Sequence, residues 1–405
     1  MVDPKPINMK KIAIVHSGIQ HSNFLAEELF RAGLLETYIT PFLATESMVW
    51  LARLFPQSKL AKVVSLRRCS VPSRYCQTRN FWFMWHLLTS KDSHTIERKF
   101  LARNFNISKN ALIYTWPTQM SLISSRFSNR FVLEFPIAHF EYLDTVKSKI
   151  NYKVEFPNTF NFSYTKEQQL MITDEVDRAY KVLYPSEFVR KSLLHAHNEI
   201  EAKLLRITYA STLREHRSQS LEDSEKLMVL FVGQLSERKG LSILNSIVKE
   251  FEDVKNIQFT FIGQKVAEDK YYSSLNWINF KYIQAVSREE LQVLMSNHQL
   301  FIMPSLFEGS ALVLHEAFAC GMCILATENC GADFIDNCKN GFILNNAPTD
   351  FIEKIYSLLQ NRAWLSEIRH RVVSSQKPQW SDNINLFKSI LEGSRDNPEE
   401  KIAKA

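Results

Sequence analysis

Short apolar runs alternate with amphipathic segments through the second half of the chain, and this alternation restricts the fold more than any other feature. The runs predict buried strands, and the segments between them predict helices. Parallel strands need crossover helices, so the alternation favours a parallel sheet with helices on both faces. The predicted strands are 226–232, 257–262, 299–303 and 322–326, and the predicted helices are 241–251, 311–319, 350–359, 364–373 and 380–391. A Ser-x-x-Glu capping box at 287–290 predicts the start of one more helix.

The first half shows the same alternation less regularly. Strand-like runs occupy 11–16, 130–134, 181–184 and 204–209, and an amphipathic segment covers 23–31. The polar, aperiodic stretch 211–225 predicts a linker. We therefore expect an α/β protein of two doubly wound, Rossmann-like domains that face each other across a ligand-binding cleft. The expected boundaries are 1–215 for the first domain and 216–379 for the second, with helix 380–393 packing back on the first and 394–405 as a frayed tail.

Composition excludes several classes of protein. The 405 residues are 45% hydrophobic and 23% charged, as in a soluble globular chain rather than a disordered one. No run of about 18 apolar residues predicts a membrane span, and the N-terminus does not resemble a secretory signal. We therefore expect a cytoplasmic protein whose six cysteines are reduced.

Basic residues gather in one segment. Residues 51–105 hold eleven Lys and Arg against two acidic residues. This charge favours an anionic ligand or surface, such as phosphate or acidic lipid. The segment contains the aromatic run 81–88, which predicts either a buried core element or a peripheral contact with the cytoplasmic face of an anionic membrane. Nucleic acid is a weaker candidate because no binding module accompanies the charge.

Several familiar motifs are absent. The chain has no Gly-x-Gly-x-x-Gly, no Walker-type phosphate loop, no Gly-x-Ser-x-Gly and no Asp-x-Asp. Their absence weakens oxidoreductase, ATPase and hydrolase readings and removes the usual metal-binding pair of sugar-nucleotide enzymes. We therefore expect an anion to be held by backbone N–H groups, Lys and Arg, with no metal and no cofactor.

The stretch 304–327 combines a strand end, a polar loop and a helix start. The loop carries Glu308, Gly309 and Ser310, and the predicted helix begins near Ala311. The free N–H groups of a helix N-terminus can bind a diphosphate. Glu316 would then reach past the phosphates to accept hydrogen bonds from two vicinal hydroxyls, as on a ribose, while Glu308 would face the group on the other side. Taken alone, both glutamates would more often be solvated surface residues than ligand contacts, and only the flanking motifs reverse this preference.

Several blocks together resemble the family 4 glycosyltransferases, which are retaining enzymes of the two-domain GT-B fold. The sequence PSLFEGSALVLHEAFACG at 304–321 is similar to the family's Glu-x7-Glu signature, and FVGQLSERKG at 231–240 to its Val-Gly-Arg-Leu-x-x-x-Lys-Gly turn. Further similarity lies at 184–190, 329–333 and 340–343, and the last helix occupies the place of the family's crossover helix.

The resemblance implies roles for individual residues. Glu316 would bind the ribose, Glu308 the donor sugar, and Lys239 the diphosphate. Gln234 stands where the family usually has arginine, and Arg238 could compensate. The implied catalytic residues are Glu308, Lys239 and His139. The implied donor-binding residues are Gly18, Gly233, Gln234, Arg238, Lys239, Glu308, Gly309, Ser310, Ala311, Leu312 and Glu316.

The resemblance also implies an activity. It is the metal-independent transfer of a sugar, with retention, from a nucleotide-diphosphate sugar to a saccharide or lipid-linked saccharide, in cell-surface polysaccharide synthesis. Two alternatives stay open, a sugar-nucleotide epimerase of the same fold and a sugar-nucleotide-binding protein without turnover. No side chain is assigned as a general base.

Other reactive side chains receive structural interpretations. Cys320 and Cys323 have a zinc-like spacing but flank a helix-to-strand turn, where buried cysteine acts as a small apolar residue. His16, His21 and His315 are interpreted as structural or surface residues.

Overall fold

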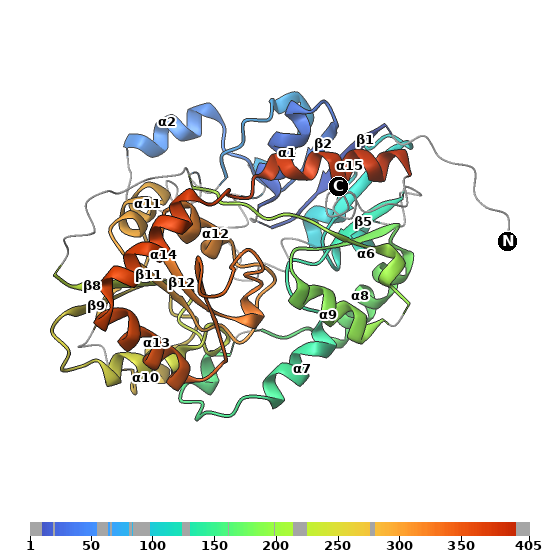
Figure 1. Cartoon of the computed structure of the whole chain (residues 1–405). Coiled ribbons are helices and arrows are strands. Elements are labelled where there is room, and N and C mark those ends of the chain that lie inside the picture. The colour runs from blue at the N-terminus through green and yellow to red at the C-terminus, as the bar shows by residue number, and fades with distance from the viewer. Residues whose placement is uncertain are drawn as a thin grey trace, which may run out of the picture.

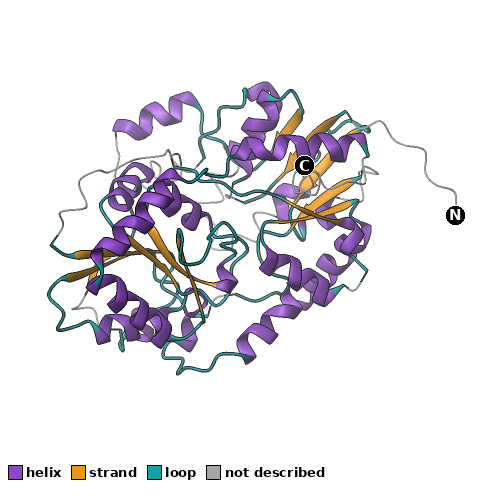
Figure 2. Ribbon diagram, viewed as in Figure 1, coloured by secondary structure: helices purple, strands orange, loops and turns teal. Residues whose placement is uncertain are grey.

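The computed structural model describes residues 10–18, 21–54, 64, 67–80, 83, 98–123, 130–160, 162–197, 199–213, 225–275 and 280–393. Two α/β halves lie side by side, each with a sheet between layers of helices (Figure 1, Figure 2). The red C-terminal helix α15 lies over the blue N-terminal elements rather than over the second half (Figure 1).

The first sheet has seven parallel strands in the order β3-β2-β1-β4-β5-β6-β7. β1, next to the middle strand β4, has apolar residues from Ile12 to Val15 that are all buried, as an interior parallel strand requires. The strands are β1 (Lys11–Val15), β2 (Leu35–Ile39), β3 (Cys76–Gln77), β4 (Ala111–Thr115), β5 (Phe131–Glu134), β6 (Lys181–Tyr184) and β7 (Leu204–Arg206). The helices are α1 (Ser22–Arg31), α2 (Glu46–Leu54), α6 (Gln119–Ile123), α7 (Phe140–Ser148), α8 (Lys166–Arg178) and α9 (Glu187–Ala196).

The second sheet has six parallel strands in the order β10-β9-β8-β11-β12-β13. Its strands are β8 (Leu227–Val232), β9 (Ile257–Ile262), β10 (Phe280–Ile283), β11 (Leu300–Met303), β12 (Cys323–Thr327) and β13 (Gly341–Leu344). Its helices are α10 (Leu241–Glu250), α11 (Arg288–Ser296), α12 (Leu312–Ala319), α13 (Pro348–Gln360) and α14 (Arg362–Ser374). The capping box predicted at Ser287 is present, with Glu290 as its partner.

The predicted class of two parallel, doubly wound domains is confirmed. The prediction missed the strands β2, β3, β4, β10 and β13, which are at most five residues long. It also extended one strand too far, because β7 ends at Arg206 and the backbone of Thr208 bonds instead to both side-chain ends of Asn383. The predicted helix 380–391 is a 3₁₀ turn, Trp380–Asp382, followed by α15 (Asn383–Glu392).

Each half has its own hydrophobic core. Trp380, Phe387 and Ile390 pack with Ile12 and Leu25 on one face of the first sheet, so the end of the chain completes the first core. This burial of large apolar side chains is what returns α15 to the first half. Residues 214–224, most of the predicted linker, and the tail beyond 393 lie outside the described residues.

Residues 150–160, which we call the arm, leave the first half and attach to the second. Phe156 is 1% exposed and belongs to the core of the second half. The backbone N–H of Glu155 donates to Ser242 Oγ at 2.8 Å, and the Glu155 carboxylate accepts from Asn245 at 2.5 Å. Thr159 Oγ1 accepts from the backbone N–H of Glu237 at 2.9 Å. The arm is therefore held by the second half although its sequence neighbours fold in the first.

Candidate functional site

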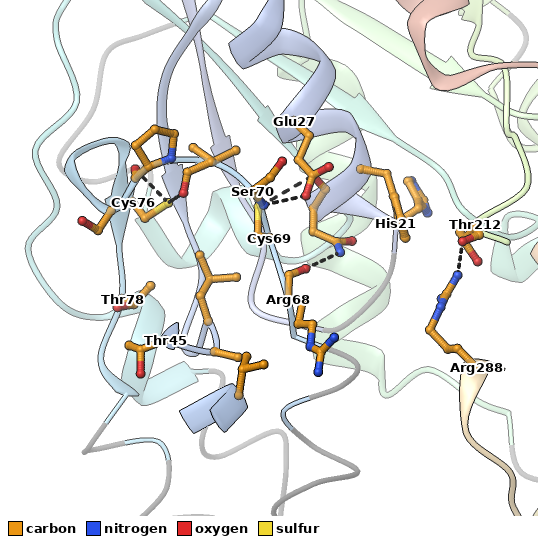
Figure 3. A pocket seen from close by; sticks show the side chains of 18 of the residues that line it. His21, Glu27, Thr45, Arg68, Cys69, Ser70, Cys76, Thr78, Thr212 and Arg288 are labelled. Atoms are coloured by element: carbon orange, nitrogen blue, oxygen red, sulfur yellow. Dashed lines mark hydrogen bonds between the residues drawn. The ribbon is translucent and has the colours of Figure 1, made fainter. Parts of the chain in front are cut away.

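A pocket of about 1350 Å³ lies between the two halves. One wall comes from the start of α1 and from residues 43–49 and 68–80 of the first half, and the other from Arg288, Leu312 and Glu316 of the second (Figure 3). Pockets for drug-sized ligands usually hold about 300–1,000 Å³. This space can therefore take a large ligand or two smaller ones at once.

Glu316 lies one turn inside α12 and lines the pocket while being only 8% exposed. Thr212 donates a hydrogen bond from its hydroxyl to Glu316 Oε1, and the Arg288 guanidinium lies 4.0 Å from the same oxygen. Burial raises the pKa of Glu316, and the Thr212 hydrogen bond and the Arg288 charge both oppose that shift. The carboxylate therefore lies in a polar environment at the pocket wall, and its contact with a ribose stays a prediction.

Glu308, Arg238 and Lys239 form one cluster of charges. Glu308 Oε1 lies 2.5 Å from Arg238 Nη1 and 2.6 Å from Lys239 Nζ, and all three side chains are 11–13% exposed. Burial lowers the pKa of Lys239, while the Glu308 charge raises it. The cluster places two cations against one carboxylate, so it can still attract an anion.

Close backbone packing positions this cluster. Gly240 has φ 77°, and a Cβ there would lie 2.1 Å from the Pro304 carbonyl oxygen. The N–H of Leu306 donates to the carbonyl of Arg238 at 2.9 Å. The turn that carries both cations is thereby fixed against the loop that carries Glu308. Only glycine combines that φ with so close an approach.

The loop before α12 touches the first half directly. A Cβ at Gly309 would lie 1.7 Å from the carbonyl oxygen of Pro136, and the Gly309 carbonyl accepts from Ser186. Ser310 Oγ lies 2.9 Å from His315 Nε2, and the Ala311 N–H donates to the Cys330 carbonyl at 3.3 Å. The Ala311 N–H, one of the helix-start N–H groups expected to bind a diphosphate, is therefore already hydrogen-bonded, and so is the Ser310 hydroxyl.

Among the remaining predicted donor-binding residues, Gly233 lies beside Lys239, whereas Gly18 lies beside Arg67 in the first half. A Cβ at Gly233 would lie 3.2 Å from the ring of Phe231 and 3.7 Å from Lys239 Cδ, so a side chain there would crowd the lysine. Gln234 is exposed, and the Gly18 carbonyl lies 3.5 Å from the Arg67 guanidinium. Leu312 lines the pocket together with Glu316.

The structure does not bring His139 to this pocket. Its Nδ1 caps α7 by accepting from the N–H of Glu141, and its ring packs against Phe140 and His197 inside the first half. Burial lowers the pKa of His139 to about 3. Its surroundings are those of a buried structural histidine, and the predicted contact with a donor sugar has no support in this geometry.

Two residues at the pocket, Thr212 and Arg288, were not predicted from the sequence, and a third, His21, was interpreted there as structural or surface. Thr212 and Arg288 reach Glu316 from the linker and from α11, and nothing in their local sequence marks them. His21 lies at the start of α1, lines the pocket and is 2.8 Å from Glu134. A signal for Glu134 existed, because it is a carboxylate within an apolar run that predicts a buried strand.

The remaining predictions concern cysteines and the membrane. All six cysteines lie in the described part of the chain as free thiols, and burial raises the pKa of Cys320 and Cys323 to about 12. Among the described residues no cluster suits a metal ion, and no helix is long and apolar enough to cross a bilayer. Most of the aromatic run 81–88 lies outside the described residues. Arg67 of the basic segment is buried, with Phe83 5.2 Å away.

Comparisons with known proteins agree with this architecture. Residues 213–378 match the family model "Glycosyl transferases group 1". The spore coat protein SA of Bacillus subtilis is 30% identical over 189 residues, which cover 42% of this chain and 48% of that protein. The chain thus matches about half the length of its curated relatives.

Solved structures resemble the whole chain. Sucrose-phosphate synthase from Thermosynechococcus elongatus has a TM-score of 0.65 at 16% identity, covering 95% of this chain and all of that one. Anabaena HepE, solved with UDP and glucose, has a TM-score of 0.63 at 12% identity, with the same coverage. These likenesses establish the GT-B fold that the sequence predicts.

Proposed function

We propose that the protein is a retaining, metal-independent glycosyltransferase that takes its sugar from a nucleotide-diphosphate donor. The family match of the second half and the GT-B fold support this proposal. Two observations carry it: Glu316 lines the pocket between the halves, and Arg238, Lys239 and Glu308, which are not among the residues that line this pocket, form one charge cluster that includes the loop before α12.

The geometry suggests how these groups would act. Glu316 binds the ribose, which sets the depth of the nucleotide. Arg238 and Lys239 then face the diphosphate. Ion pairs with the diphosphate oxygens replace part of their ion pairing with Glu308. Cleavage of the bond between the anomeric carbon and phosphate places negative charge on the leaving group, and preorganised cations in a largely buried site stabilise that charge. Glu308, released by the cations, contacts the transferred sugar.

The acceptor belongs to the first half in this proposal. It is a saccharide or a lipid-linked saccharide, in the synthesis of a cell-surface polysaccharide. Gln234 does not need to bind phosphate, because Arg238 already supplies a second cation beside Lys239. If the acceptor carries a lipid, the basic segment 51–105 contacts the cytoplasmic face of the membrane.

A screen of nucleotide sugars tests the proposal. UDP-glucose, UDP-N-acetylglucosamine and GDP-mannose are each added to the protein, and the free energy of unfolding is measured. A donor at 100 times its dissociation constant adds about 2.7 kcal/mol. Transfer is then measured on methyl glycosides of glucose, galactose and N-acetylglucosamine. Conversion of the donor sugar without any acceptor would indicate an epimerase, and binding without turnover would indicate a sugar-nucleotide-binding protein.

A further inference from the structure

His21 is the group in the pocket whose environment most resembles that of a functional side chain. Its ring is 2% exposed, and Nε2 lies 2.8 Å from Glu134 Oε1. Glu134 is fully buried at the end of β5, and its Oε1 also accepts a hydrogen bond from the Tyr209 hydroxyl. A buried carboxylate is costly unless it is paired, so this arrangement fixes one ring nitrogen of His21 toward the first half.

Aromatic neighbours fix the plane of the His21 ring. Trp380 stacks on it with a centroid distance of 5.2 Å and an interplanar angle of 11°, and Tyr209 lies 4.3 Å away. His21 is the N-cap residue of α1, yet its side chain makes no capping hydrogen bond. The ring therefore does not serve its own helix, and it remains part of the pocket lining (Figure 3).

The chemistry of a ligand at this position follows from the opposite wall. The ribose and diphosphate contacts proposed above all come from the second half, whereas His21 belongs to the first half. Because Nε2 lies against Glu134, the nitrogen left for a ligand is Nδ1. Nδ1 accepts a hydrogen bond from a hydroxyl in one tautomer and donates one to it in the other. We propose that His21, oriented by Glu134, hydrogen-bonds a hydroxyl group of the acceptor saccharide. This inference rests on the proposed glycosyltransferase function.

Steady-state kinetics with a donor and a methyl glycoside from the screen tests the inference. We expect His21→Leu to raise KM for the acceptor about tenfold, as the loss of one hydrogen bond predicts, with a smaller change in KM for the donor. The Kd for UDP should stay unchanged. Glu134 acts through His21 as a positioning residue, so Glu134→Gln should raise KM for the acceptor in the wild-type background but add little to His21→Leu.

Two controls separate this role from a structural one. His298→Leu removes another buried histidine, one that bonds to Thr260 and Leu294 in the second half, and should lower stability without changing KM for the acceptor. If His21→Leu does not fold, His21→Gln keeps a polar group in the pocket and should show a smaller rise in KM.

Each other result decides against the inference. Transfer by the wild type with unchanged KM for the acceptor in the His21 variants overturns it and leaves the proposed function standing. A rise confined to KM for the donor assigns His21 to the donor site instead. No transfer by the wild type to any of the glycosides refutes the proposed function, and the inference falls with it.

Discussion

Replacing Glu308 with glutamine should destabilise the protein and raise its affinity for pyrophosphate. The substitution removes the carboxylate that pairs with both Arg238 and Lys239. Breaking a buried ion pair costs about 3–5 kcal/mol of stability. The three side chains are about one-tenth exposed, and the glutamine amide oxygen can still accept one hydrogen bond. We therefore expect a cost near the lower end, about 3 kcal/mol. Urea denaturation of Glu308→Gln and wild type measures this difference.

Pyrophosphate provides the decisive comparison because it needs no assumption about base or sugar. In the wild type it must displace Glu308 from the two cations, whereas in Glu308→Gln it meets them unopposed. We expect its Kd to fall about tenfold, or 1.4 kcal/mol, in the variant. Glu328→Gln, which neutralises an exposed carboxylate one loop away, should change neither quantity. Equal stability and equal pyrophosphate affinity in wild type and Glu308→Gln would refute the argument that these three charges form one buried cluster.

Four further predictions concern Lys239, Glu316, the arm and His139. Lys239→Met should lower turnover by about 10²–10³-fold through lost stabilisation of the leaving group, and a near-normal rate would transfer that role to Arg238. Glu316→Gln should abolish most of the preference for UDP over 2′,3′-dideoxy-UDP, measured by calorimetry; an unchanged preference would contradict the ribose contact. Phe156→Ala should destabilise the second half by about 3–5 kcal/mol in urea, although residue 156 lies among first-half sequence, and a smaller loss would mean that the arm is loosely held. Burial lowers the pKa of His139 to about 3, whereas an unfolded histidine titrates near 6.5, so its contribution to stability is complete above pH 6.5 and is lost as the pH falls toward 3. Between pH 7 and pH 4.5, the free energy of unfolding should therefore fall by about 2–3 kcal/mol less in His139→Asn than in the wild type. Parallel plots of this free energy against pH for the two proteins would contradict the prediction.

The second half was the more predictable part of the fold. Its strands β8, β9, β11 and β12 are apolar runs set off by polar loops, so period and length sufficed to locate them within one residue. The cluster of Glu308, Arg238 and Lys239 follows from two strand ends that meet at one edge of a sheet. β2, next to the edge strand, and β4, the middle strand of the first sheet, were both missed, although Gly33 and Pro41 flank β2 and Asn110 and Pro117 flank β4.

The wall of the pocket from the first half could not be predicted in the same way. His21, Glu134 and Trp380 come together from three distant parts of the chain, and local pattern gives no information on such contacts. The local sequence was equally uninformative at His139, where a residue predicted to contact the donor sugar caps α7 in the interior of the first half. Sequence patterns locate elements well, but side-chain environments depend on tertiary packing.

The arm determines how the two halves can move relative to each other. Because Phe156 is anchored among second-half side chains and Thr159 bonds to Glu237, the middle of the arm would travel with the second half during any opening. Ile150 and Phe160, at the ends of the arm, also pack in a cluster with Leu143 of α7. The joints of such a motion then lie where the arm leaves α7 and where it rejoins α8, as well as in the linker and the return to α15. Thr159 and Tyr152 contact Glu237, which directly precedes Arg238 and Lys239, so the segment that holds both cations would keep its contacts with the arm as the halves move. The positions of the two cations would then be independent of how far the two halves open.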